Sequence, residues 1–257
     1  MTRETTAGSG LKSFIKGIPV LGSTAGKLAQ LPIVARVRSL AFPGSASFWE
    51  SVYRNGGTSG PGSYGRLAQF KAEVLNNFVR SENVCKVIEF GCGDGSQLEL
   101  ASYPEYIGVD IAAGSIERCS SRFASDPTKR FFLTSDLPKD IGTFDLAISL
   151  DVIYHLVEDR VFEAYMRTLF GYAERHAVIY SSNRDAVTPA VHVRHRKFTD
   201  WIDKNASEWR PSGFVPNPFP FDPDRPEETS CADFYLFTRQ VPDGAFRSEA
   251  VSTSKKV

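Results

Sequence analysis

The sequence predicts an α/β fold, a seven-stranded and mostly parallel sheet with helices on both faces. From residue 84 onward, short apolar segments alternate with helical ones, which is typical of parallel strands joined by crossovers. After the fifth strand, two extended segments follow each other with no helix between them, so the final strand is expected to run antiparallel.

The expected elements can be assigned in chain order. A helix over 66–79 with one apolar face precedes the first strand. The parallel strands are expected at 84–90, 107–109, 131–133, 144–150 and 177–180, with helices at 96–102, 114–124, 158–172 and 197–206. Residues 209–220 and 232–238 should form the antiparallel pair at the sheet edge, joined by the loop 221–230.

Length and composition indicate how the chain is organised. Its 257 residues divide into an N-terminal arm (1–45), one α/β domain (46–240) and a polar tail (241–257). The 30 basic and 30 acidic residues balance, which counts against a nucleic-acid partner, because such proteins usually carry a basic excess. No apolar stretch is long enough to span a membrane, and the four cysteines form no C-x-x-C pair, so we expect a reducing, cytoplasmic location.

The arm is basic and amphipathic. Lysines and arginines occur from Lys12 to Arg38, among apolar residues at helical spacing, with no acidic residue between Glu4 and Glu50. One interpretation is that residues 1–45 touch the anionic surface of the inner membrane, or a partner. The alternative is that the arm packs on the domain with its charges in water.

The strongest motif is the turn after the first strand. The apolar residues from Val87 run directly into Gly91-Cys92-Gly93-Asp94-Gly95. Because glycine has no Cβ atom, a ligand can lie against the backbone at the carboxyl end of the strand. The third glycine comes one position too early for a pyrophosphate-binding turn.

Acidic residues follow the next two strands. Asp110 ends the second strand, where a carboxylate can accept both ribose hydroxyls of a nucleoside. Asp136, followed by Leu137, comes after the third strand, where a carboxylate can accept the adenine amino group. Glu89 lies near the end of the first strand, an unusual place for a charge, and could orient an ammonium group of the ligand.

This arrangement resembles the class I S-adenosylmethionine-dependent methyltransferases, whose first motif reads as an acidic residue, one apolar residue and then Gly-Cys-Gly-x-Gly. The resemblance covers roughly residues 66–238 and implies a Rossmann-like methyltransferase fold with S-adenosylmethionine as the cofactor. The residues that it implies for cofactor binding are Glu89, Gly91, Cys92, Gly93, Gly95, Asp110, Ile111, Asp136, Leu137 and Leu150. The alternative is an unrelated nucleotide-binding α/β domain.

Residues 55–65 are rich in glycine and cannot form a helix or a central strand. Together with residues 70–76, they look like a bacterial subgroup of these methyltransferases that is found with glycosyltransferases of surface polysaccharides. This likeness implies a glycosyltransferase partner and a loop that folds over the cofactor, with Tyr64 near the sulfonium. A plain linker is the alternative.

Methyl transfer to a hydroxyl needs an acceptor for the hydroxyl proton. His155 follows the fourth strand, at the edge where this fold exposes the reacting methyl group, and is our candidate for the general base. Asp151 would orient His155 or Tyr154, or bind the acceptor, and Tyr154 is a candidate acceptor-binding residue. Structural roles for His155 and Asp151 are the alternative.

Asp151 with Asn183 or Asp185 could also offer oxygen ligands to Mg²⁺. The adjacent Asp-Asn pair expected after the fifth strand of metal-dependent relatives is missing, because the sequence there reads Ser181-Ser182-Asn183-Arg184-Asp185. We therefore predict no metal.

A basic cluster follows the fifth strand, and we expect it over the same crevice. Arg194 and Arg196 suit bidentate contacts with a phosphate or carboxylate, and His192 and His195 lie beside them. These four residues are our candidates for acceptor binding. A solvated basic face is the alternative.

The absence of two motifs narrows the class of acceptor further. The fourth strand is not followed by an Asn-Pro-Pro-aromatic or Asp-Pro-Pro-aromatic tetrapeptide, and no thiol lies in either acceptor segment, so a nucleic-acid substrate is disfavoured. The sequence predicts O-methylation of a sugar of a polysaccharide or glycolipid precursor. The alternatives are methylation of another small metabolite or lipid headgroup at oxygen or nitrogen, and a non-catalytic cofactor-binding partner subunit.

Overall fold

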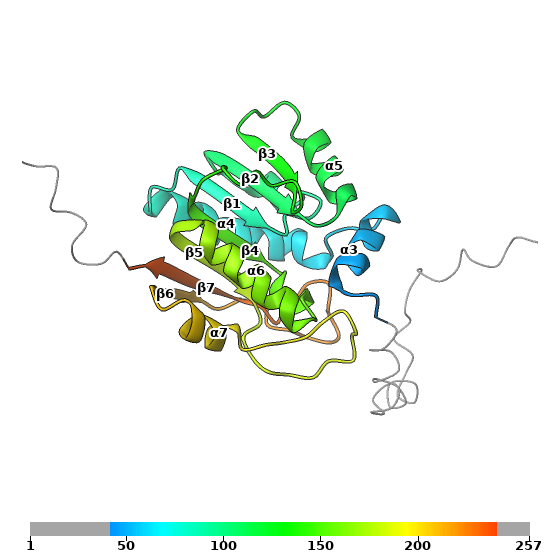
Figure 1. Cartoon of the computed structure of the whole chain (residues 1–257). Helices are drawn as coiled ribbons and strands as arrows, with labels where there is room; N and C mark the ends of the chain where they lie inside the picture. The colour runs from blue at the N-terminus through cyan, green and yellow to red at the C-terminus, as the bar shows by residue number, and fades with distance from the viewer. Residues whose placement is uncertain (1–41, 241–257) are drawn as a thin grey trace, which may run out of the picture. The chain divides into compact units, whose positions relative to one another are not determined.

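The computed structural model describes residues 42–240, and its sheet has seven strands in the order β3-β2-β1-β4-β5-β7-β6 (Figure 1). The predicted tail and all but the last four residues of the predicted arm lie outside this range. The strands are β1 (Lys86–Phe90), β2 (Glu105–Asp110), β3 (Lys129–Leu133), β4 (Phe144–Leu150), β5 (Ala173–Ser181), β6 (Trp209–Val215) and β7 (Asp233–Arg239).

The direction of the strands confirms the predicted fold class. β1 pairs in parallel with both β2 and β4, and Ile88 lies opposite Ile107 and Ala147. The final strand, β7, lies between β5 and β6 and is antiparallel to both. The strand order reverses between β1 and β4, which is where an open α/β sheet forms its ligand crevice, beyond the carboxyl ends of the strands.

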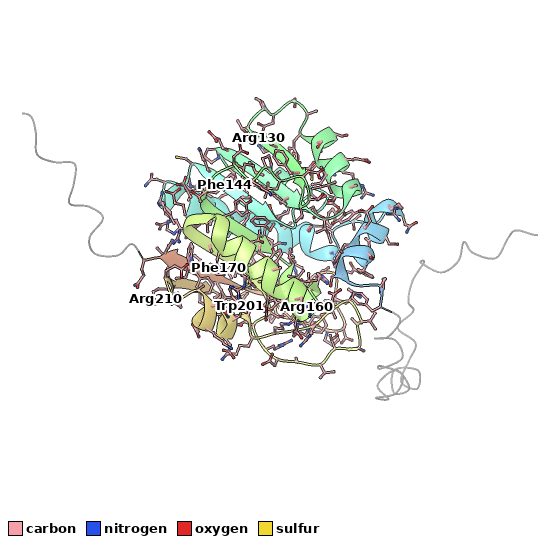
Figure 2. All side chains as sticks on the ribbon, in the orientation of Figure 1. Arg130, Phe144, Arg160, Phe170, Trp201 and Arg210 are labelled. Carbon is pink, nitrogen blue, oxygen red and sulfur yellow. The ribbon has the colours of Figure 1, made fainter. Side chains whose placement is uncertain are left out.

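Helices cover both faces of the sheet. α4 (Gly65–Ser81) and α5 (Ala113–Arg122) pack on one face, and α6 (Asp159–Tyr172) and α7 (Phe198–Asn205) pack on the other (Figure 1). Phe170 of α6 stacks on Trp201 of α7 with ring centroids 6.4 Å apart, and both are labelled in Figure 2. The alternation of side chains along β1 explains the two layers, since Ile88 belongs to the α6 side and Val87 to the α4 side.

Most element boundaries lie within four residues of the prediction, and three differences are larger or concern the kind of element. The helix expected at 96–102 is only the 3₁₀ turn η2 (Leu98–Leu100), because Pro104 disfavours helical backbone just before β2. β6 ends at Val215 rather than at residue 220, since Pro216 and Pro218 cannot donate to a strand ladder. Residues 46–54, for which no element was predicted, lie in the helix α3 (Ser45–Arg54).

None of the helices within residues 42–240 has the length and apolar character to cross a lipid bilayer. Cys85, Cys92, Cys119 and Cys231 are free thiols in the structure.

Candidate active site

The turn after β1 is held in a conformation that favours glycine. Gly91 and Gly93 have φ angles of +85° and +58°. A Cβ atom on Gly91 would lie 2.3 Å from Val152 Cγ2, and one on Gly93 would lie 2.2 Å from Ser59 Oγ. The glycines therefore allow protein side chains to approach the turn closely, in addition to any ligand.

Asp110 closes this turn. Its Oδ2 accepts a hydrogen bond from the amide of Gly93 (3.0 Å), and its Oδ1 accepts one from the amide of Ala112 (2.9 Å). The carboxyl group is buried, and burial raises its pKa, although the backbone hydrogen bonds oppose that shift. Each oxygen keeps a second lone pair, so the carboxylate can also accept hydrogen bonds from the hydroxyl groups of a ligand.

One cavity of about 420 Å³ opens at this edge of the sheet, within the usual size range of small-molecule sites. Of the sequence-predicted residues it brings together Glu89, Gly91, Cys92, Gly93, Asp110, Ile111, Leu150, Asp151 and His155. α3 and α6 supply further parts of the lining, among them Trp49, Tyr53, Arg160 and Tyr165. Arg160 lies at the start of α6, where Figure 2 labels it.

Other predicted cofactor residues are not part of this lining. Asp136 is exposed and accepts a hydrogen bond from Ser135 Oγ (2.8 Å), while Leu137 packs against the apolar core. Thr134, which directly follows β3, lines the cavity in their place. Gly95 packs against α5, since a Cβ atom there would lie 2.9 Å from Phe123.

The glycine-rich loop contacts the turn through Ser59 and Tyr64. The amide of Ser59 donates to Asp94 Oδ2 (3.0 Å), and the amide of Asp94 donates to Ser59 Oγ (2.9 Å). The Tyr64 hydroxyl donates to the same Asp94 oxygen (2.9 Å) and does not line the cavity. Asp94 thus ties Tyr64 to the glycine turn.

Asp151 connects three elements at the end of β4. Its Oδ2 accepts a hydrogen bond from Lys71 Nζ of α4 (2.7 Å), and its Oδ1 accepts one from the Tyr154 hydroxyl (2.8 Å) in η3 (Ile153–His155). A Cβ atom on Gly62 would lie 2.8 Å from Asp151 Oδ2, so the glycine-rich loop passes directly over this carboxylate. Asp151 itself has a φ of +60°, a strained conformation of the kind often found at functional sites.

His155 lines the cavity beside Trp49, whose ring centroid lies 4.8 Å from the imidazole. Its Nδ1 is 3.1 Å from the backbone carbonyl oxygen of His192. Because a carbonyl can only accept, Nδ1 carries the proton and Nε2 holds the lone pair. Burial lowers the pKa of His155 to about 4, so the ring is neutral at neutral pH.

Arg194 and Arg196 of the basic cluster are not among the residues that line the cavity. Both guanidinium groups bind the carbonyl of Val157 and the carboxylate of Asp159, and Arg196 also binds the carbonyl of Leu156. These contacts fix the loop before α6. His192 stacks on Phe48 of α3 (4.6 Å), and His195 Nδ1 bonds Ser182 Oγ (2.7 Å), so neither lines the cavity.

The residues of the alternative magnesium set are engaged elsewhere. Asn183 bonds Thr199, and Asp185 accepts from the amide of Lys197. No group of three or more potential metal ligands occurs among residues 42–240.

Lys71 and Gln97 are among the polar residues of the lining that were not predicted. Lys71 is 1% exposed and lies on the apolar face of α4, and Gln97 is 8% exposed and follows the glycine turn. A lysine among Leu67, Ala68, Ala72 and Leu75 was a signal that could have been noticed, because an unpaired ammonium is rarely buried. Trp49 and Tyr53 were missed because α3 was not predicted.

Comparison with known proteins agrees with the site. Residues 87–173 match a family model described as a methyltransferase domain. No curated protein matches the chain. The solved structures with a similar fold include the methyltransferase domain of bacterial CtHen1, which is 23% identical, with 66% of this chain and 98% of that chain covered and a TM-score of 0.51.

Two further structures have the same fold. The N-methyltransferase NodS from Bradyrhizobium japonicum WM9 is 18% identical, with 67% of this chain and 87% of that chain covered and a TM-score of 0.53. CalS10, an amino pentose methyltransferase from Micromonospora echinaspora, is 13% identical, with 69% of this chain and 94% of that chain covered and a TM-score of 0.51. At these identities the likeness shows the fold alone.

The segment that matches the family model contains the glycine turn, Asp110 and the end of β4, which are the parts around which the cavity is built. Residues 87–173 thus match a methyltransferase domain, within a chain that has the fold of these solved methyltransferase structures.

Proposed function

We propose that this chain is a class I S-adenosylmethionine-dependent methyltransferase that methylates a hydroxyl group on a sugar of a polysaccharide or glycolipid precursor, with His155 as the general base. The observation that carries the choice of a hydroxyl is the hydrogen bond between His155 Nδ1 and the carbonyl of His192. Because Nδ1 donates this hydrogen bond, Nε2 keeps its lone pair. The imidazole lines the cavity and can therefore accept a proton there.

S-adenosylmethionine supplies an electrophilic methyl group attached to a positively charged sulfur. A new bond forms between the methyl carbon and the acceptor oxygen while the bond from carbon to sulfur breaks, and the electron pair stays on sulfur. His155 Nε2 takes the proton that the oxygen loses. The low pKa of His155 makes it a weak base. The acceptor hydroxyl becomes more acidic as its oxygen bonds to the methyl carbon, so we expect the proton to move after that bond has begun to form.

Two observations support a sugar-containing acceptor. The indole of Trp49 lines the cavity beside His155, and aromatic rings are suited to pack against the C–H faces of a sugar. CalS10, one of the proteins with the same fold, is an amino pentose methyltransferase. Since the lining also includes Leu156, Val161 and Ala164, an acceptor with an apolar part, such as a glycolipid or lipid headgroup, is the second candidate.

The test is to incubate the protein with S-adenosylmethionine carrying a labelled methyl group and a panel of sugar nucleotides, glycolipids and simple lipids. We expect the label on a sugar hydroxyl, with a mass gain of one methylene that survives mild acid hydrolysis of the glycosidic bonds. Label on a nitrogen, or on a lipid without a sugar, would contradict the proposed acceptor.

The partner and the membrane contact are proposals from the sequence alone. A glycosyltransferase partner should co-purify with the full chain under mild conditions. For the arm, equal binding of the full chain and of a chain lacking residues 1–45 to anionic vesicles would rule out a membrane role.

A further inference from the structure

The polar end of the cavity carries both signs of charge. Lys71, Glu89 and Asp151 all line it, and Lys71 and Glu89 are 1% and 4% exposed. Glu89 Oε2 accepts a hydrogen bond from the Tyr106 hydroxyl (2.6 Å). Burial raises the pKa of Glu89 to about 7, while that hydrogen bond and the nearby charge of Lys71 lower it.

Lys71 and Gln97 belong to one structural unit. Gln97 Nε2 donates to the carbonyl of Ala68 (3.1 Å), which lies three residues before Lys71 on α4 and therefore on the same helix face. Helix α4 and the segment after the glycine turn thus bring the two side chains to the same end of the cavity.

Both side chains have unused hydrogen-bonding capacity. Gln97 Oε1 is buried and has no hydrogen-bond partner within residues 42–240. Lys71 Nζ donates to Asp151 Oδ2, the one acceptor it has in the described part of the chain, so two of its three N–H donors stay unused there. Buried polar groups without partners are costly, which indicates that a ligand completes them.

We propose that Lys71 is shared between Asp151 and the carboxylate of a bound amino-acid group, whose ammonium meets Gln97 Oε1 and Glu89. The ligand is the amino-acid end of the methyl donor, so this inference rests on the proposed function. Lys71 then connects cofactor binding at the glycine turn to Asp151 on the acceptor side. Because Gly62 passes over the same pair, the glycine-rich loop lies against this connection.

The shared charge gives two opposite expectations. Removing the ammonium of Lys71 should weaken binding of a ligand that has the carboxylate. Removing the negative charge of Asp151 should strengthen it, because Asp151 competes for Lys71 and repels the carboxylate. Asp151→Asn suits this purpose, since asparagine tolerates a positive φ and its carbonyl oxygen can still accept from Tyr154.

The experiment measures dissociation constants by calorimetry for two ligands, S-adenosylhomocysteine and 5′-methylthioadenosine, which has the same adenosine and sulfur but no amino-acid group. For Lys71→Met, we expect the constant for S-adenosylhomocysteine to rise by about tenfold to a hundredfold, the usual effect of losing a hydrogen bond to a charged group. The constant for 5′-methylthioadenosine should stay within about twofold, because the missing ammonium does not touch that ligand.

For Asp151→Asn, the constant for S-adenosylhomocysteine should fall by at least about threefold, with 5′-methylthioadenosine again unaffected. Lys86→Met, at an exposed position at the start of β1, is the matched control and should change neither constant.

Retained binding of 5′-methylthioadenosine shows that each variant is folded. Equal losses for both ligands in Lys71→Met, or weaker binding of S-adenosylhomocysteine in Asp151→Asn, would overturn the shared-charge proposal while leaving the cofactor assignment intact. Failure of the wild-type protein to bind either ligand would overturn the cofactor assignment itself.

Discussion

The amide of Gly93 donates a hydrogen bond to Asp110 Oδ2 at 3.0 Å, so the glycine turn after β1 and the carboxylate after β2 form one unit. The other carboxylate oxygen accepts from the amide of Ala112, so both oxygens face backbone donors. An amide side chain cannot satisfy this arrangement, because its NH₂ group would meet one of the two N–H groups.

Asp110→Asn should therefore weaken the binding of S-adenosylhomocysteine by at least about tenfold, even though the side chain keeps its shape. Calorimetry checks this, with Asp140→Asn as the control at an exposed carboxylate outside the cavity lining. If Asp110→Asn and Asp140→Asn bind the ligand equally well, Asp110 has no part in cofactor recognition.

Substitutions at two glycines can separate the cost of a positive φ angle from the cost of a steric clash. Gly91 and Gly142 have nearly the same φ, +85° and +82°, but a Cβ atom would meet Val152 at 2.3 Å in the first case and nothing within 4 Å in the second. Gly142→Ala should thus cost only the strain of a left-handed residue, about 1–2 kcal/mol of the free energy of unfolding.

Gly91→Ala should cost more, because Val152 must move, and it should also weaken cofactor binding. Urea denaturation and calorimetry on both variants test this. Equal losses of stability with unchanged binding would show that the turn tolerates a side chain.

The sequence predicted the sheet well because each strand carries its own local signal. The apolar segments of β1, β4 and β5, the turn glycines and Asp110 are short-range features, and they fix the crevice. The acceptor side was predicted less well, since long-range contacts decide it. Arg194 and Arg196 have the chemistry of anion binding, but Asp159 and the carbonyls of Leu156 and Val157 occupy them.

Two further residues received no role from the sequence because long-range contacts determine what they do. Asp94 was an unassigned position of the turn motif, yet it binds both Ser59 and Tyr64 and so fixes the glycine-rich loop. Lys71 has the spacing of a core residue on α4, and only the position of Asp151 explains why its ammonium can be buried.

The proposed general base gives a kinetic prediction. His155→Gln should lower kcat for the acceptor found in the panel by about 100-fold, the usual contribution of general-base catalysis, with an unchanged dissociation constant for S-adenosylhomocysteine. His192→Gln is the control, because it keeps the backbone carbonyl that holds His155 Nδ1. Similar kcat values for both variants would assign proton transfer to another group.

The same imidazole also gives a prediction about stability. The pKa of His155 is about 4 in the folded protein because burial disfavours the charged ring, whereas the ordinary value is 6.5. Between these two pH values the unfolded chain binds more protons than the folded one at this site. The free energy of unfolding therefore falls as the pH decreases from 6.5 towards 4.

Glutamine does not titrate, so His155→Gln removes this contribution and leaves that of every other group. Between pH 7 and pH 5, the wild-type protein should lose about 1–2 kcal/mol more of its free energy of unfolding than the variant does. Urea denaturation at pH 7, 6 and 5 measures the difference, and the lowered pKa values of His192 and His195 are common to both proteins. Parallel decreases in the two proteins would mean that His155 titrates in the folded state as it does in the unfolded chain, and a charged imidazole would then be present in the cavity at mildly acidic pH.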